Sequence, residues 1–217
     1  MGQRTEITHT TGGTDGHNLE AQSIATIGRC LAGKSRASAM WNLLVNDAET
    51  KTHWQMADFV ATKKLGMNDH GETHAKVATA SALTMLDLLE AGGVQPDFVA
   101  GGFGDRDDAA LVVLVATLCH DFGNMVHRTD HAELSIMLAI PVLDRLLPEI
   151  YPDRVKMTQV KSFILSSNIL ASRGTQAADD RGGAGLYRGF HGHDEGARAG
   201  CLRTGKHHHP FGLGSRY

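Results

Sequence analysis

The feature that most constrains the fold is an apolar stretch from Ala109 to Cys119 that ends directly in His120 and Asp121. A helix that is apolar on every side fits only in the centre of a protein or in a membrane. The stretch is far shorter than the roughly 20 residues that a membrane span needs. We therefore expect a buried helix over 109–121, capped by Asp107 or Asp108 and broken by Gly123.

Other segments also show helical periodicity. The further helices expected span 19–32, 37–60 (one or two helices), 72–91, 131–147 and 155 onward. Asp130 and Glu133 form a capping-box pattern before the helix that opens at His131, and Pro141 predicts a kink in it. No segment alternates between polar and apolar residues as a strand would. The sequence predicts an all-α fold.

The clearest amphipathic helix spans 72–91 and ends at two consecutive glycines. Apolar or small residues recur along it at steps of three and four, which places them on one helix face. This stripe consists of His74, Val77, Ala78, Ser81, Met85, Leu88 and Leu89. We therefore expect His74 on the buried face of its helix.

The two ends of the chain differ from its middle. Residues 1–18 are polar, and residues 166–217 hold 11 of the 25 glycines with only seven Leu, Ile, Val, Met or Phe residues. So few apolar side chains cannot offset the entropy of ordering the backbone. The sequence predicts a disordered N-terminal segment (1–18), a helical domain (19–165) and an irregular or disordered tail rich in Gly, Arg and His (166–217).

Charge and cysteine usage narrow the class of protein. A formal net charge of −3 gives no electrostatic reason to expect nucleic acid or an acidic membrane as the main partner. The N-terminus lacks the pattern of a signal peptide. Cys30, Cys119 and Cys201 are widely separated, which argues against a disulfide framework and fits the reducing cytoplasm. We expect a cytoplasmic protein and leave a homo-oligomer open.

The chemistry of the chain centres on His74, His120 and Asp121. A carboxylate and imidazoles on buried helix faces need partners, because an unpaired buried charge is very costly. A divalent cation is one such partner, since nitrogen and carboxylate oxygen suit Zn, Mn, Fe or Ni. The alternative is that both histidines are hydrogen-bonded core residues, which predicts that no metal binds.

Three motifs stand in order along the chain: NDHGETH over 68–74, HDFGN over 120–124 and VHR over 126–128, followed by His131. Over about residues 20–165 the chain resembles the HD superfamily of metal-dependent phosphohydrolases, and more closely a group of predicted HD hydrolases with the pattern NDHGxxH…HDxGNxVHRxxH. The resemblance implies an HD-domain helical bundle and hydrolysis of a phosphate mono- or diester. It also implies a divalent ion (Mn, Fe, Ni, Zn or Mg) and a small phosphorylated, nucleotide-like substrate.

The resemblance also implies residue roles. His74, His120 and Asp121 match metal ligands, and Asp121 also matches a catalytic group that bridges two ions or orients the attacking water. His131 matches a position that binds a second ion in two-metal relatives. His127 and Arg128 match catalytic positions that contact the substrate phosphate. Asn124 stands where many relatives have lysine, and no role is assigned to it. Asp69 and His70 are expected to fix the turn before His74, and direct ligation of the metal by them is the alternative.

The chain departs from the family pattern after Leu165. The family closes its metal site with a later Asp, whereas this chain continues as SSNILA over 166–171. Read one nucleotide later, codons for these six residues can encode HQIYSH, and codons from Tyr187 onward can encode the family motif ADSTDMTKGRAR. We infer a shifted reading frame near Leu165. On this view the tail histidines, such as His191, His193 and the triplet at 207–209, result from the shifted reading frame and are not ligands of the native site.

The remaining alternative to a hydrolase is a non-catalytic helical protein that binds a metal or nucleotide for regulation.

Overall fold

The computed structural model describes residues 13–179 of the chain, and the side chains of residues 18–167 within that range. This part of the chain forms helices and connecting turns and contains no strand, so the predicted all-α fold class is confirmed. In chain order the helices are α1 (Gly13–Cys30), α2 (Ser35–Asn46), α3 (Ala48–Asp58), the π-helix η1 (Phe59–Lys64), α4 (Glu72–Ala91), α5 (Asp97–Ala100), α6 (Arg106–Cys119), the 3-10 helix η2 (Phe122–Met125), α7 (His131–Leu146), the 3-10 helix η3 (Leu147–Glu149) and α8 (Arg154–Asp179).

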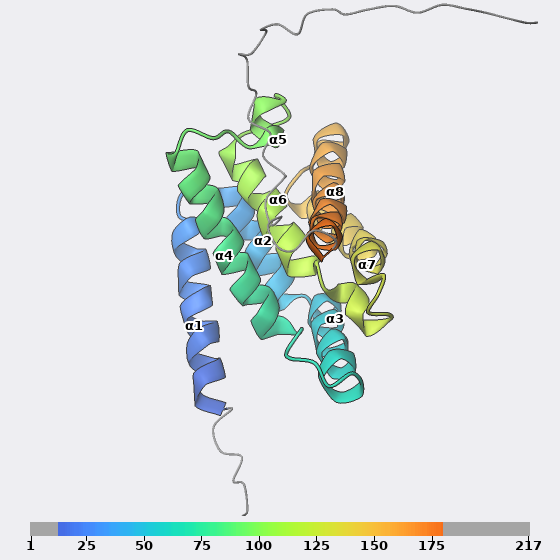
Figure 1. Ribbon diagram of the computed structural model, residues 1–217. Coiled ribbons are helices and arrows are strands. Elements are labelled where there is room, and N and C mark those ends of the chain that lie inside the picture. Colours follow the sequence, from blue (N-terminus) through green and yellow to red (C-terminus); the bar gives the residue numbers. More distant parts are fainter. Residues whose placement is uncertain (1–12, 180–217) are drawn as a thin grey trace, which may run out of the picture.

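Helix α6 lies in the centre of the bundle and packs against α2, α4 and α8 (Figure 1). Its side chains are buried almost all round, with Leu111 and Leu114 completely inaccessible. Full burial of one such leucine stabilises the fold by about 2 kcal/mol. The stretch Arg106–Met125 is long and apolar enough to cross a membrane by those two criteria, but 78% of its most apolar window is buried inside the fold. The predicted central helix is therefore a core helix of the bundle.

The cap of α6 differs from the prediction. The N-cap is Asp105, whose carboxylate accepts hydrogen bonds from the amides of Asp107 and Asp108, while Asp108 accepts from the amide of Asp105. The side chain of Asp107 instead accepts from the amides of Arg36 and Ala37 at the start of α2. The predicted caps were wrong because the helix begins one turn earlier, which frees Asp107 to cap a neighbouring helix.

The start of α6 is fixed by a buried ion cluster around Asp108, whose side chain is only 4% exposed. Its carboxylate accepts from Tyr151 at 2.7 Å and pairs with Arg36 at 2.8 Å and Lys156 at 2.7 Å. Burial alone would raise the pKa of Asp108, but the bonds from Lys156 and Tyr151 outweigh it and leave the pKa lowered. This cluster joins α6 to α2 and α8 at the end of α6 that lies away from His120.

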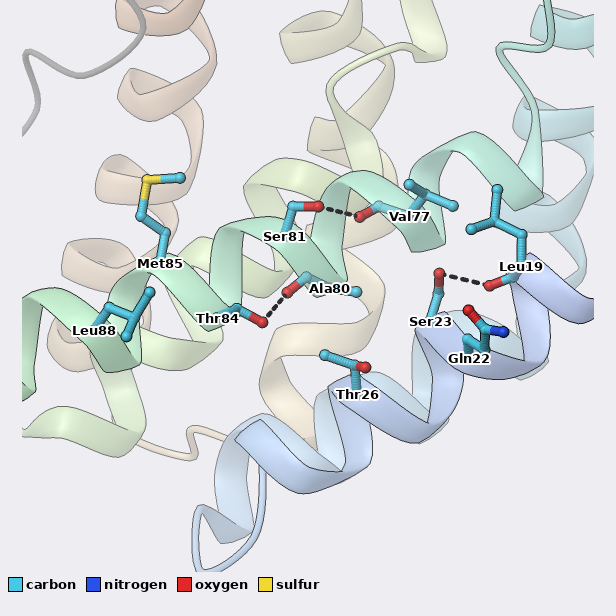
Figure 2. Close-up of a pocket in the computed structure, with 10 residues that line it drawn as sticks. All are labelled: Leu19, Gln22, Ser23, Thr26, Val77, Ala80, Ser81, Thr84, Met85 and Leu88. Carbon is cyan, nitrogen blue, oxygen red and sulfur yellow. Dashed lines mark hydrogen bonds between the residues drawn. The ribbon is translucent and has the colours of Figure 1, made fainter.

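Helix α4 buries a different face from the one predicted. The buried residues are Ala75, Lys76, Thr79, Ala80, Leu83 and Leu86, whereas His74 is only half-buried. The predicted stripe is rotated, so Val77, Met85 and Leu88 line an open groove of about 440 Å³ between α1 and α4 (Figure 2). The prediction failed because α4 packs against α6 on one side and α1 on another, and small residues such as Ala75 and Thr79 make the close contact with α6.

The outer helices also begin or end differently from the prediction. Helix α1 starts at Gly13, inside the segment predicted to be disordered, and α8 continues past Leu165 to Asp179. The stretch 166–179 contains a single glycine and no proline, so local propensity still favours a helix there. Helix α7 runs through Pro141, and its N-cap Asp130 forms no side-chain cap bond, so the predicted capping box is absent.

Candidate metal centre

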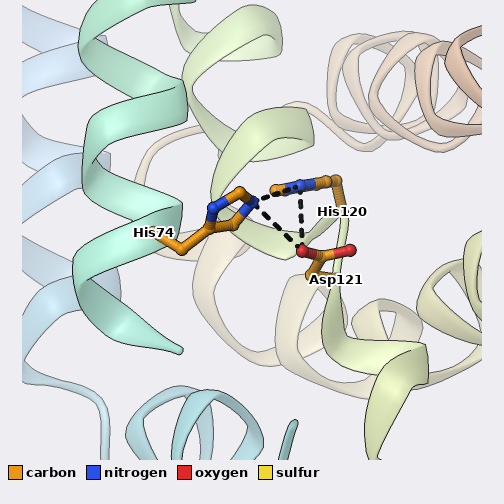
Figure 3. A group of neighbouring side chains, drawn as sticks. All are labelled: His74, His120 and Asp121. Carbon is orange, nitrogen blue, oxygen red and sulfur yellow. Dashed lines mark hydrogen bonds and ion pairs between the residues drawn. The ribbon is translucent and has the colours of Figure 1, made fainter. Parts of the chain in front are cut away.

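The centre is built where α6 ends. The last residue of α6 is Cys119, His120 is its C-cap, and Asp121 is the N-cap of η2, so the backbone turns between the two side chains. The first turn of α4 brings His74 to the same point (Figure 3). The sequence-predicted convergence of these three side chains is thus present in the structure.

The three donor atoms form a compact triangle. The Nε2 atoms of His74 and His120 lie 3.4 Å apart, and each lies 3.2 Å from Oδ2 of Asp121. One nitrogen or oxygen from each residue, all within 4.8 Å of one another, could hold a single metal ion. Ligand bonds of about 2.1 Å in a tetrahedral site place neighbouring donors about 3.4 Å apart. The donor set and its spacing therefore fit one divalent ion.

Hydrogen bonds to the backbone set the tautomers of two histidines at the centre. Nδ1 of His120 lies 2.7 Å from the carbonyl oxygen of Thr117, and Nδ1 of His131 lies 2.8 Å from that of Arg128. A carbonyl can only accept, so each Nδ1 carries the proton and each Nε2 keeps its lone pair when the ring is neutral. Metal-binding histidines are commonly oriented in this way.

The Asp121 carboxylate presents its two oxygens to different histidines. Oδ2 faces His74 and His120, whereas Oδ1 lies 3.6 Å from Nε2 of His131 at the start of α7. A carboxylate in this arrangement can bind one metal ion through each of its two oxygens. The side chains of His74, His120 and His131 are 37%, 31% and 27% exposed, so solvent reaches the centre.

Charge in the centre is shared between the carboxylate and the imidazoles. Burial by itself would raise the pKa of Asp121, but hydrogen bonds from His120 and His74 hold that pKa far below its usual range. Burial likewise opposes protonation of His120, yet the bond and the negative charge of Asp121 leave its pKa raised. In the absence of a metal, imidazole protons therefore stabilise the buried carboxylate, which is the role that a cation would take over.

The loop before α4 supports His74. Nδ1 of His70 lies 2.6 Å from the carbonyl oxygen of Asn68, and the Asp69 carboxylate accepts from the amide of Gly71 at 2.7 Å. The ring of His70 stacks on that of His74 with centroids 5.3 Å apart. These contacts confirm the expectation that Asp69 and His70 fix the turn.

Arg128 and His127 take different positions. Arg128 is half-buried, and its positive charge acts on His120, where it opposes protonation. His127 is 61% exposed, and its Nδ1 lies 3.6 Å from Asp130 rather than beside the three predicted ligands. The structure therefore brings Arg128, but not His127, toward the centre.

The sequence reasoning missed residues that hold the centre together. Ser135, one turn into α7, has its hydroxyl 2.6 Å from the carbonyl oxygen of His120 and 2.7 Å from that of His131, and it accepts from the amide of Gly123 at 2.8 Å. A Cβ at Gly123 would lie 1.9 Å from the His131 carbonyl oxygen, so only glycine permits this approach. The spacing of four residues between His131 and Ser135 was the available signal, since it places both on one helix face.

The end of α6 has a further support in Trp54, whose Nε1 donates to the carbonyl oxygen of Leu118 at 2.8 Å. Cys119 is completely buried, and burial raises the pKa of its thiol to about 12. The thiol therefore points into the core and adds no sulfur ligand. The tail histidines His191, His193 and 207–209 lie outside the described residues.

Comparison with known proteins gives one curated relative of note. The chain is 32% identical over 135 residues to an uncharacterized protein of Methanocaldococcus jannaschii, a match that covers 62% of this chain and 52% of the relative. The chain thus spans about half the length of that relative. No family model and no solved structure matches the chain.

Proposed function

We propose that the protein is a metal-dependent phosphohydrolase of the HD superfamily, located in the cytoplasm. The observation that carries the proposal is the convergence of His74, His120 and Asp121, two imidazoles and one carboxylate with mutual distances of 3.2–3.4 Å. The motifs that contain these residues resemble those of the HD hydrolases. Nitrogen and carboxylate donors without a thiolate favour Mn, Fe, Ni or Zn, with Mg as a weaker fit.

Each side chain around the centre would have a separate role in hydrolysis. A bound divalent ion would lower the pKa of water toward about 7 and neutralise charge on phosphoryl oxygens. Asp121, with its pKa far below the usual range, is a poor proton acceptor, so its carboxylate would orient a water molecule by accepting a hydrogen bond. Arg128 would bind the phosphate of a small, nucleotide-like ester. His131, facing the second oxygen of Asp121, would hold a further ion.

A non-catalytic helical protein that binds a metal or nucleotide for regulation is the second candidate. Within residues 18–167, no acidic side chain other than Asp121 joins the donor cluster. A centre with three ligands leaves several coordination positions to water, which suits either weak metal binding or an open catalytic site. Turnover separates the two candidates.

The test combines metal analysis with a panel of phosphomonoesters and phosphodiesters. We expect the purified chain to bind a transition metal, and Asp121→Asn and His120→Ala to lose both metal and turnover. Asp144→Asn is the matched control, because Asp144 is exposed and pairs only with Lys161 on the surface.

The outcomes are distinct. Bound metal without turnover, also after the predicted reading frame is restored, would favour the binding protein. Absence of bound metal in the wild-type chain and in the frame-restored chain would refute the proposal and leave His74 and His120 as packed core residues.

A further inference from the structure

Asn124 lies at the centre of η2 and is 1% exposed. Its backbone amide donates to the carbonyl oxygen of Asp121 at 3.0 Å, which places it one turn beyond the candidate ligand. Its side-chain Oδ1 accepts from Nη1 of Arg128 at 2.8 Å. The residue therefore connects the turn that carries Asp121 to the guanidinium group of Arg128.

The orientation of the Asn124 amide is fixed by Arg128. A guanidinium group can only donate, so the amide oxygen rather than the amide nitrogen must face it. In the part of the chain that the structure describes, the buried Nδ2 has no hydrogen-bond partner. An unpaired buried donor is unfavourable for folding. Asn124 thus places its amide oxygen on Arg128, and its amide nitrogen has no partner among the described residues.

The partner of Arg128 is neutral. Among the described residues, no carboxylate forms an ion pair with its guanidinium, in contrast to Arg36 and Arg145, which are paired with two or more acidic residues. A guanidinium held by an amide keeps its full positive charge, and its other donors form no hydrogen bond with the residues that the structure describes. Such a planar group binds the oxygens of a phosphate with two parallel hydrogen bonds.

We propose that Asn124 is a positioning residue that holds the uncompensated guanidinium of Arg128 as an anion-binding group beside the metal centre. This inference rests on the proposed function, because it supplies the phosphate-binding part of that site. The identity of the residue matters: an aspartate at position 124 would hold Arg128 equally well but would neutralise it. Asn124 acts through Arg128 and does not touch the reacting atoms.

The experiment measures binding of inorganic phosphate to the Mn-loaded full chain by calorimetry at low ionic strength. We expect Arg128→Ala, Asn124→Ala and Asn124→Asp each to weaken binding by about tenfold, which is the loss expected for about 1.4 kcal/mol. The double variant Asn124→Ala/Arg128→Ala should bind no more weakly than Arg128→Ala alone. Asn46→Ala, whose exposed amide donates to Asn42 within α2, is the matched control.

The results separate the inference from the function on which it rests. If the Asn124→Ala and Asn124→Asp variants bind phosphate like the wild type while Arg128→Ala does not, the inference alone is wrong. A further tenfold loss from Asn124→Ala in the Arg128→Ala background would show a general structural role and would also overturn it. If the Mn-loaded wild type binds no phosphate, the anion-binding part of the proposed function fails and the inference with it. Asn124→Asp is nearly isosteric, so it keeps the test decisive if Asn124→Ala does not fold.

Discussion

The hydroxyl of Ser135 offers the sharpest test of how the centre is held together. It is completely buried and serves the Gly123 amide and the carbonyl oxygens of His120 and His131 at once. Ser135→Ala leaves the buried Gly123 amide without this acceptor, which costs about 1–3 kcal/mol. With about 2–4 °C of melting temperature per kcal/mol for a domain of this size, we expect the melting temperature to fall by roughly 2–12 °C.

The measurement pairs urea unfolding with a Mn affinity determined by competition with a chelator. Ser81→Ala is the matched control, because the exposed Ser81 hydroxyl donates only to Val77 within α4, and its loss should change stability by less than about 0.5 kcal/mol. We expect Ser135→Ala, but not Ser81→Ala, to weaken Mn binding by about tenfold, since groups that orient metal ligands have effects of that size. An unchanged free energy of unfolding, or a destabilised variant with wild-type Mn affinity, would refute the reasoning.

Two further predictions concern protons and space at the same site. The pKa of His120 is raised, so its protonation stabilises the metal-free fold below pH 6.5, the ordinary pKa, and this contribution is lost as the pH rises through the folded pKa. The pKa of Asp121 is lowered, so its ionisation stabilises the fold above pH 3.8, the ordinary pKa, and this contribution is lost at lower pH. Thermal melts in chelator should therefore show stability falling as the pH rises above 6.5. Saturating Mn should reverse the trend, because ligation requires neutral imidazoles. A metal-free protein whose stability does not change with pH would contradict this. Gly123→Ala should destabilise the fold by about 3 kcal/mol in urea, because its Cβ would overlap the His131 carbonyl oxygen, whereas Gly28→Ala, which meets no atom within 4 Å inside α1, should stabilise it by about 0.5–1 kcal/mol. Equal effects of the two glycine substitutions would show that the close approach is unimportant.

The parts of the structure that the sequence predicted are those with a strong local signal. The apolar run before His120 predicted the central helix, since no other position suits a helix that is apolar all round. The motifs around His74 and His120 predicted which side chains meet, because they resemble a family in which these positions converge. Asp69 and His70 also act in the turn as expected.

The parts that could not be predicted depend on contacts between distant segments. The buried face of α4 is set by two neighbours at once, so a single stripe of apolar residues, with His74 in it, gave the wrong rotation. The cap of α6 by Asp105 was hidden because Asp107 and Asp108 are equally good caps, and only the position of α2 shows what Asp107 binds. The spacing from His131 places Ser135 on the same face of α7, but its bonds to His120 and Gly123 appear only when α7 packs against the end of α6.

The Asp108 cluster and the candidate metal centre lie at opposite ends of α6. At the N-terminal end of α6, the ion pairs of Asp108 and its hydrogen bond from Tyr151 join α6 to α2 and α8 without any ligand. At the other end, imidazoles from α4, the end of α6 and α7 surround Asp121, and the Ser135 hydroxyl lies on the carbonyl oxygen of His120, so a bound ion would hold these three helices together. If the centre binds an ion, the two ends of α6 are held in different ways, and the supply of metal would change the rigidity of only one half of the molecule.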